Sequence, residues 1–158
     1  MESIDKSLEG KNISAADAAI YKGEGYFARA YMYFGLAKRY GGVPLIDHAQ
    51  DKDYVPGSEA SIKVPRSTEK DTWKFIIEDC DRAIEALPET AASKYRASKW
   101  AALALKSRVA LYAASVAKYT SNAPMTGEAV SQKLVGMSAS DAAEFYQECI
   151  DASAEIIS

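Results

Sequence analysis

The stretch from Glu24 to Ile46, EGYFARAYMYFGLAKRYGGVPLI, constrains the fold of this chain more than any other. Apolar and aromatic side chains recur in it at three- and four-residue spacing, as they do on one face of a helix: Phe27, Ala30, Tyr31, Phe34 and Ala37. Further apolar and aromatic residues occupy the remaining circumference of this helix: Tyr26, Tyr33, Leu36 and Tyr40. We therefore expect a helix buried on more than one side. Glycines 41 and 42 and then Pro44 end this helix, because glycine adopts backbone angles closed to other residues and proline lacks the amide donor.

The same reasoning predicts the remaining helices. The first helix begins at Ser14, and a second begins at the capping signal Ser67-Thr68 and stops before Pro88. A third, over 95–118, is rich in alanine, which favours helix and permits close packing, and a fourth runs from about residue 140 to the chain end. The sequence therefore predicts an all-α fold with two long loop insertions, 41–67 and 119–139. We expect both tryptophans, Trp73 and Trp100, in its core.

The predicted helices form two similar pairs. Four residues of the first helix (Arg29, Tyr33, Arg39, Tyr40) recur in the third at a constant offset as Arg108, Tyr112, Lys118 and Tyr119. Each pair consists of a long helix, a long loop and a shorter helix, which predicts tetratricopeptide-like helical hairpins whose tight turns are replaced by insertions. The apolar stripe of the last helix reaches Ile156 and Ile157 with no following helix to cover it, so we expect an exposed apolar edge there.

Charge and hydropathy exclude some partners. The net charge is −3 and the pI is near 5.3, without a cluster of Lys and Arg, so we expect no nucleic-acid partner. No run reaches the roughly 18 to 20 apolar residues of a membrane-spanning helix. The first five residues, MESID, lack the basic and apolar regions of a signal peptide. A length of 158 residues is typical of one domain, and we interpret 1–158 as a single helical domain.

The sequence contains residue types that can act in catalysis, but their positions do not form a recognisable catalytic site. Glu78, Asp81 and Glu85 fall on the solvated face of the second helix beside basic residues, which does not fit a catalytic carboxylate pair. The sole histidine, His48, lies in a loop with no evident nucleophile, so we interpret it as a surface residue. We therefore expect no enzyme and no catalytic residue.

The sequence also lacks a convincing metal or cofactor site. Asp47, Asp51 and Asp53 are spaced like part of a calcium site, but no glutamate follows at the EF-hand spacing. Cys80 and Cys149 lie among apolar helix positions, which favours two buried thiols, and a disulfide between them stays open as the alternative. We expect no metal and no cofactor.

One loop residue stands apart from the helical stripes. Tyr54 lies within the first long loop among polar neighbours that include Asp51 and Asp53. Aromatic faces stack on sugar rings while carboxylates hold sugar hydroxyls, so these three residues are candidate ligand-binding residues. An alternative remains open, in which Tyr54 packs against the helices and merely anchors the loop.

Several motifs, in order, resemble one protein family. The run from Phe27 to Leu45 reads F-x-R-A-Y-x-Y-F-x-L-x-x-x-Y-G-G-V-P-L; it is followed by VPRST at 64–68, WKFIIED at 73–79, AIEALP at 83–88 and ASKWAALALKSRVALY at 97–112. Together they resemble the SusD/RagB family of outer-membrane glycan-binding lipoproteins. The resemblance covers residues 18–118 well and 141–157 loosely.

This resemblance implies a function. It implies a SusD-like α-α superhelix that binds an oligosaccharide or other nutrient without catalysis and delivers it to a SusC-like TonB-dependent transporter, which the helical repeats contact. It also implies a place on the outer-membrane surface, held by an N-terminal lipid anchor upstream of this chain, which we interpret as an N-terminal piece of a longer protein. A different class remains as the alternative, a tetratricopeptide-type protein interaction module that binds no sugar.

Overall fold

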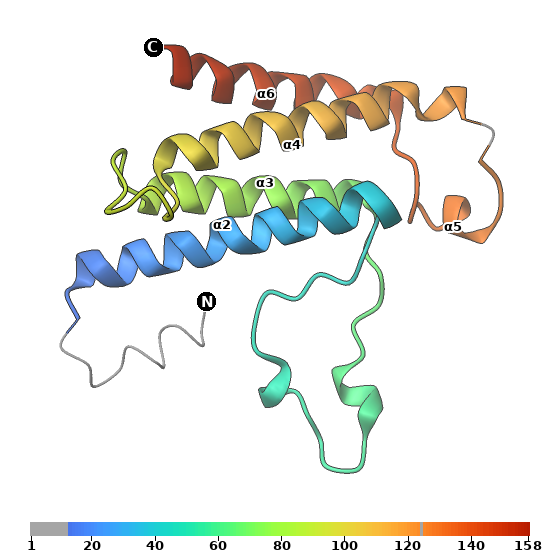
Figure 1. The fold of residues 1–158 in the computed structure, drawn as a ribbon. Coiled ribbons are helices and arrows are strands. Elements are labelled where there is room, and N and C mark those ends of the chain that lie inside the picture. Colours follow the sequence, from blue (N-terminus) through green and yellow to red (C-terminus); the bar gives the residue numbers. More distant parts are fainter. Residues whose placement is uncertain (1–12, 124) are drawn as a thin grey trace.

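The computed structural model describes residues 13–123 and 125–158 and shows a helical protein (Figure 1). The long helices are α2 (Ala15–Tyr40), α3 (Glu69–Ala86), α4 (Lys99–Tyr119) and α6 (Ala142–Ile157), and α5 (Glu128–Ser131) is a single turn. Short 3-10 turns lie in the loops: η1 (Gln50–Lys52), η2 (Glu59–Ile62), η3 (Thr120–Asn122) and η4 (Ala139–Asp141). Over these two ranges there is no β-strand, only an isolated bridge between Val55 and Ser58. The predicted all-α class is confirmed.

Hydroxyl side chains begin three of the long helices. The Ser14, Thr68 and Ser98 hydroxyls each accept a hydrogen bond from the backbone amide three residues later, which satisfies one of the free donors of the first turn. At the other end of α2, Gly41 has a φ of 70° and donates its amide to the carbonyl of Ala37. That left-handed conformation favours glycine, and it turns the chain out of the helix where the sequence predicts the stop.

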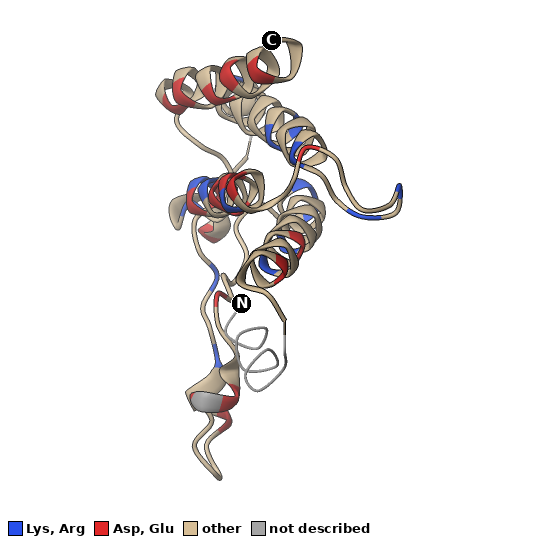
Figure 2. Ribbon diagram, turned by 90° about the vertical axis from the view of Figure 1, so that its left-hand side faces the viewer, with Lys and Arg blue, Asp and Glu red and all other residues tan. Residues whose placement is uncertain are grey.

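The helices stack in a zigzag, α2 on α3, α3 on α4 and α4 on α6. Seen along the helix axes, α2 and α4 form one column and α3 and α6 the other (Figure 2). This is the arrangement of tetratricopeptide-like hairpins that the repeated pattern predicts.

The main core is formed by residues of all four long helices. The rings of Phe34 and Trp73 meet edge to face with centroids 6.1 Å apart, and Phe34 meets Tyr112 in the same way at 5.3 Å. Small residues let the helices approach closely: a Cβ atom on Gly23 of α2 would lie 2.9 Å from the Cβ of Ala86. Gly23 thus allows the end of α3 to pack closely against α2.

Two expectations about burial are wrong. The outer face of α2 is open to solvent, with Tyr31 64% exposed and Met32 and Tyr40 also exposed, because α3 covers only one side of this helix. Trp100 is 38% exposed; it occupies the first turn of α4, where the Lys99 ammonium lies over its ring. Trp73, in contrast, is fully buried.

The last helix exposes an apolar edge, as expected. Ile157 is 84% exposed and Ile150 is also exposed, whereas the buried residues of α6 are Ala142, Phe145 and Ala152. The aligned position in α3, Ile77, is buried because α3 lies between two helices, while α6 packs mainly on α4. Within the described ranges, no helix has the length and hydropathy needed to cross a membrane.

Both long loops leave the same end of the helical stack (Figure 1). The segment between α2 and α3 extends well away from the helices, whereas the segment between α4 and α6 stays beside the ends of α2 and α3. The first of these segments carries the three candidate ligand-binding residues.

Candidate functional site

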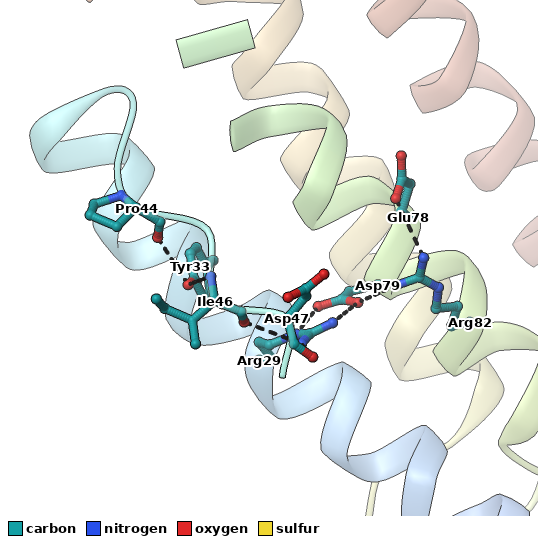
Figure 3. A network of polar contacts seen from close by, with 8 residues as sticks. All are labelled: Arg29, Tyr33, Pro44, Ile46, Asp47, Glu78, Asp79 and Arg82. Carbon is teal, nitrogen blue, oxygen red and sulfur yellow. Dashed lines mark hydrogen bonds and ion pairs between the residues drawn. The ribbon is translucent and has the colours of Figure 1, made fainter. Parts of the chain in front are cut away.

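The base of the first long loop is held by two side chains of α2. Arg29 and Tyr33 are four residues apart in the helix, so both point from the same face toward the chain that follows Pro44 (Figure 3). Both belong to the motif that resembles SusD-like proteins. Their contacts explain why a positive charge and a phenol are needed at this spacing.

Arg29 forms a buried ion pair with α3. Its Nε donates to Oδ2 of Asp79 at 2.6 Å and its Nη2 donates to Oδ1 at 2.8 Å, in the bidentate geometry that favours arginine (Figure 3). The Asp79 side chain is 0% exposed, and its other ionic partner among the described residues is Arg82, 3.3 Å away. The hydrogen bonds that Arg29 donates to Asp79 raise the pKa of Arg29 above its ordinary value, so the guanidinium stays charged.

The same guanidinium also holds the loop. Arg29 Nη1 donates to the carbonyl oxygens of Ile46, at 3.3 Å, and Asp47, at 3.2 Å. Its plane lies against the Phe75 ring, with Cζ 4.7 Å from the ring centroid. Arg29 therefore joins α2, α3 and the beginning of the loop through one side chain.

Tyr33 holds the adjacent part of the loop. Its hydroxyl donates to the carbonyl of Pro44 at 3.1 Å and accepts from the amide of Ile46 at 2.9 Å (Figure 3). An extended segment has no helical or sheet partner for these backbone groups, and the phenol supplies one. Residues 44–47 are thus fixed to the face of α2.

The two ends of the loop are also joined to each other. Arg66 donates to the carbonyls of Tyr40 at 2.7 Å and Gly42 at 2.8 Å, and the amide of Ser67 donates to the carbonyl of Val43 at 3.1 Å. A Cβ atom on Gly42 would lie 2.0 Å from the carbonyl oxygen of Ser67, so this close approach requires glycine. Two of the family-like motifs, around residues 41–43 and 64–68, therefore meet in space.

The candidate ligand-binding residues lie beyond this base. Tyr54 is 50% exposed, and Asp51 and Asp53 are exposed on either side of the end of η1. Oδ2 of Asp53 lies 2.6 Å from Nε2 of His48, but no hydrogen bond joins Tyr54 to Asp51 or Asp53 in the described part of the chain. Ligand binding by Tyr54, Asp51 and Asp53 stays a prediction.

His48 links two carboxylates across the turn. Its Nδ1 lies 2.5 Å from Oδ1 of Asp47, and its Nε2 lies close to Asp53. The hydrogen bond with Asp47 and then that with Asp53 raise the pKa of His48, and the bond from His48 lowers the pKa of Asp47. A protonated imidazole donates to both carboxylates at once and so closes the turn 47–53.

Other carboxylates of α3 are engaged in ion pairs. The carboxylates of Glu78 and Asp81 are exposed and pair with Arg82 and Lys106, while Asp79 is engaged by Arg29. Within these ranges no group of three His, Cys, Asp or Glu side chains is placed to hold a metal ion. Both cysteines are free thiols, with Cys80 buried.

Sequence reasoning missed the two buried carboxylates of α3. The sequence pattern places Glu78, Asp81 and Glu85 on the solvated face of this helix and assigns no role to Asp79, which is buried. Glu69 is also buried; its carboxylate accepts from the indole of Trp73 at 3.3 Å and from the amide of Gly136 at 2.5 Å. The position of Asp79 between buried Ile76, Ile77 and Cys80 is the signal that distinguishes it from Glu78.

Comparison with known proteins agrees with the motifs. The model of a SusD-like family, described as starch-binding and associating with the outer membrane, matches residues 1–111. SusD-like protein P38 of Formosa agariphila is 35% identical over 92 residues, which are 58% of this chain and 17% of that protein.

Solved structures share the fold. A SusD-like protein from Bacteroides fragilis is 30% identical with a TM-score of 0.68, over 98% of this chain and 24% of that one. A structure described as a laminarin-binding SusD-like protein is 25% identical with a TM-score of 0.58, over 70% of this chain and 23% of that one. This chain thus spans about a quarter of the length of these solved relatives. The match of the family model over most of the chain, together with these relatives, shows that this protein belongs to the SusD/RagB (SusD-like) family.

Proposed function

We propose that this chain is the helical scaffold of a protein that captures glycan at the outer-membrane surface and delivers it to a SusC-like TonB-dependent transporter. In this proposal the protein performs no catalysis and needs no cofactor. The family supports this function, since its model is described as starch-binding and one solved relative as laminarin-binding. Which glycan is bound depends on side chains outside the shared motifs.

The observation that carries the proposal is the anchored loop. Arg29, Tyr33 and Asp79, all within family-like motifs, hold the loop base, while the exposed Tyr54 lies beyond it. A half-exposed tyrosine near carboxylates on an anchored loop supplies a stacking face with little ordering cost on binding. We assign Tyr54, Asp51 and Asp53 to the contact with the sugar.

The experiment is a glycan titration of the protein produced from its native gene. Soluble starch, laminarin and other soluble glycans are titrated by calorimetry against the wild type and a Tyr54→Ala variant. We expect Tyr54→Ala to weaken binding of the recognised glycan at least tenfold. Tyr95→Ala is the matched control. Tyr95 is 86% exposed and lies in the loop between α3 and α4, at the opposite end of the helices. Equal affinities of the wild type and Tyr54→Ala would refute the assignment.

Delivery to a transporter is tested separately. The proposal places the protein on the outer-membrane surface, where the helical stack contacts the SusC-like partner. Affinity purification from outer membranes should recover a TonB-dependent transporter in stoichiometric amount. Recovery of the protein alone from such membranes contradicts this part of the proposal and leaves glycan binding intact.

One observation favours a second candidate, a tetratricopeptide-type interaction module without sugar binding. The outer face of α2 displays Tyr31, Met32 and Tyr40 to solvent, and exposed aromatic and methionine side chains are enriched where proteins meet. If no glycan binds in the titration while a protein partner is recovered, this second function replaces the first.

A further inference from the structure

A cavity of about 600 Å³ lies where the start of α3 meets the second long loop. None of its lining residues belongs to the loop tip that carries Tyr54. Its polar lining includes Lys70 and Asp71 of α3 and Lys133 and Ser138 of the second loop. A volume of this size accommodates a small-molecule ligand.

Lys133 has an unusual backbone conformation. Its φ is 57°, and within the described ranges it is the single residue other than glycine with a positive φ. This conformation directs its carbonyl to the amide of Glu69, which donates to it at 2.9 Å and so caps the beginning of α3. Glycine or asparagine adopts this conformation with less strain than lysine, so the backbone role alone does not account for a lysine.

The Lys133 side chain is available to a ligand. Lys133 lines the cavity and is exposed, and its ammonium has no hydrogen-bond or ion-pair partner among the residues that the structure describes. The other lysine of the cavity, Lys70, is already paired with Asp141, with Nζ 2.7 Å from Oδ1. The carboxylate of Asp71 accepts from the hydroxyl of Thr68 at 2.6 Å.

The lining offers both donors and acceptors. Lys70 and Asp141 are paired with each other, and the hydroxyls of Thr120 and Ser138 are hydrogen-bonded to the Val116 carbonyl and the Ser140 hydroxyl. The Lys133 ammonium is thus left as a donor and the Asp71 carboxylate as an acceptor. Val135 and Met137 add an apolar wall. This combination suits a ligand whose hydroxyl groups both donate and accept and whose carbon skeleton is partly apolar, which describes a neutral sugar ring.

We propose that this cavity is a sugar subsite in which the Lys133 ammonium donates to ligand hydroxyls and Asp71 accepts from them. The inference rests on the proposed glycan-binding function and adds to it a site apart from Tyr54. The strain at Lys133 is then retained because the side chain binds ligand, as is common where stability and function compete.

The test distinguishes the role of the Lys133 side chain from the role of its backbone. Lys133→Asn removes the ammonium and keeps a residue that tolerates positive φ, whereas Lys133→Arg keeps a cation. The ¹⁵N-labelled protein is titrated with soluble starch, laminarin and, as an acidic glycan, alginate oligosaccharides, and amide shifts of Gly136 and Ser138 are followed by NMR. We expect a neutral glycan to shift both amide signals. Lys133→Asn should weaken that binding at least tenfold without lowering the thermal midpoint, and Lys133→Arg should keep an affinity within about threefold of the wild type.

Each other outcome overturns the inference in a distinct way. Shifts confined to the turn 47–54 refute this subsite while the proposed function stands. Wild-type affinity in Lys133→Asn refutes the role of the ammonium, and shifts with alginate alone show an anion site instead of a neutral sugar subsite. The absence of shifts with every glycan overturns the subsite together with the proposed function.

Discussion

Removing Arg29 tests the arrangement that holds the first loop. Arg29→Leu leaves the Asp79 carboxylate, 0% exposed, without its two short hydrogen bonds and with Arg82 at 3.3 Å as its remaining ionic partner in the described structure. Loss of one member of a buried pair costs about 3–5 kcal/mol, because a charge stays buried without compensation. At about 2–4 °C per kcal/mol for a chain of this size, the thermal midpoint should fall by about 6–20 °C.

The double variant Arg29→Leu/Asp79→Leu distinguishes an ion pair from simple packing. With both charges gone, no carboxylate is left unpaired, and the free energy of unfolding should return to within about 2 kcal/mol of the wild type. The loop should nevertheless loosen, because the carbonyls of Ile46 and Asp47 lose their donor. The double variant therefore restores the scaffold without restoring the loop base.

Two measurements read these effects. Urea unfolding gives the free energies for the double-mutant cycle, and hydrogen exchange of the Ile46 amide, which donates to Tyr33, reports on the loop. Arg82→Leu serves as the control; its side chain is about half exposed, and it should cost less than about 1 kcal/mol. A loss below about 1 kcal/mol in Arg29→Leu, or a double variant no more stable than the single one, would refute the reasoning.

Three further predictions follow from other contacts. The pKa of His48 is raised, so the His48 bridge between Asp47 and Asp53 is fully present below the ordinary histidine value of about 6.5 and is lost as the pH rises through the raised value. NMR titration of the imidazole should show a lower His48 pKa in Asp53→Asn than in the wild type. An unchanged His48 pKa contradicts the bridge. Gly42→Ala should lower the free energy of unfolding by at least about 2 kcal/mol, because the added Cβ meets the Ser67 carbonyl. Gly35→Ala, in the interior of α2 where the nearest contact of an added Cβ is at 3.5 Å, should raise it by about 0.5–1 kcal/mol. Thermal unfolding that gives both variants the same sign of change argues against the close approach at Gly42. Burial raises the pKa of the Cys80 thiol to about 12, so iodoacetamide at pH 8 should modify Cys80 only after unfolding; peptide mapping that finds it modified in the native protein shows an open core.

The helices were predictable because their signals are local. Ser14 and Thr68 begin helices through contacts three residues away, and Gly41 ends α2 through its own backbone angle. Ser98 begins α4 in the same way, but the expected start of this helix at residue 95 is four residues too early. The spacing of apolar residues likewise predicts which face of α3 is buried. Short turns such as α5 have no comparable periodicity and were not predicted.

The base of the loop was not predictable in the same way. The pairing of Arg29 with Asp79 joins residues 50 positions apart, and the contact of Glu69 with Gly136 joins residues 67 positions apart. No local pattern specifies such partners; the motifs identify the family without stating what each residue touches. Trp100 shows the converse limit, since its apolar side chain favours the core while its place in the first turn of α4 leaves it partly exposed.

The clamped ends of the first loop bear on how such proteins diversify. Because residues 40–47 and 66–67 are fixed by Arg66, Tyr33 and Arg29, the intervening chain can lengthen or change sequence without disturbing the helices. Doubling the length of a flexible loop costs only about 0.6 kcal/mol in closure entropy. Evolution, or a protein engineer, can therefore exchange the segment between residues 48 and 62 as a cassette, and new recognition properties can arise on an unchanged helical frame.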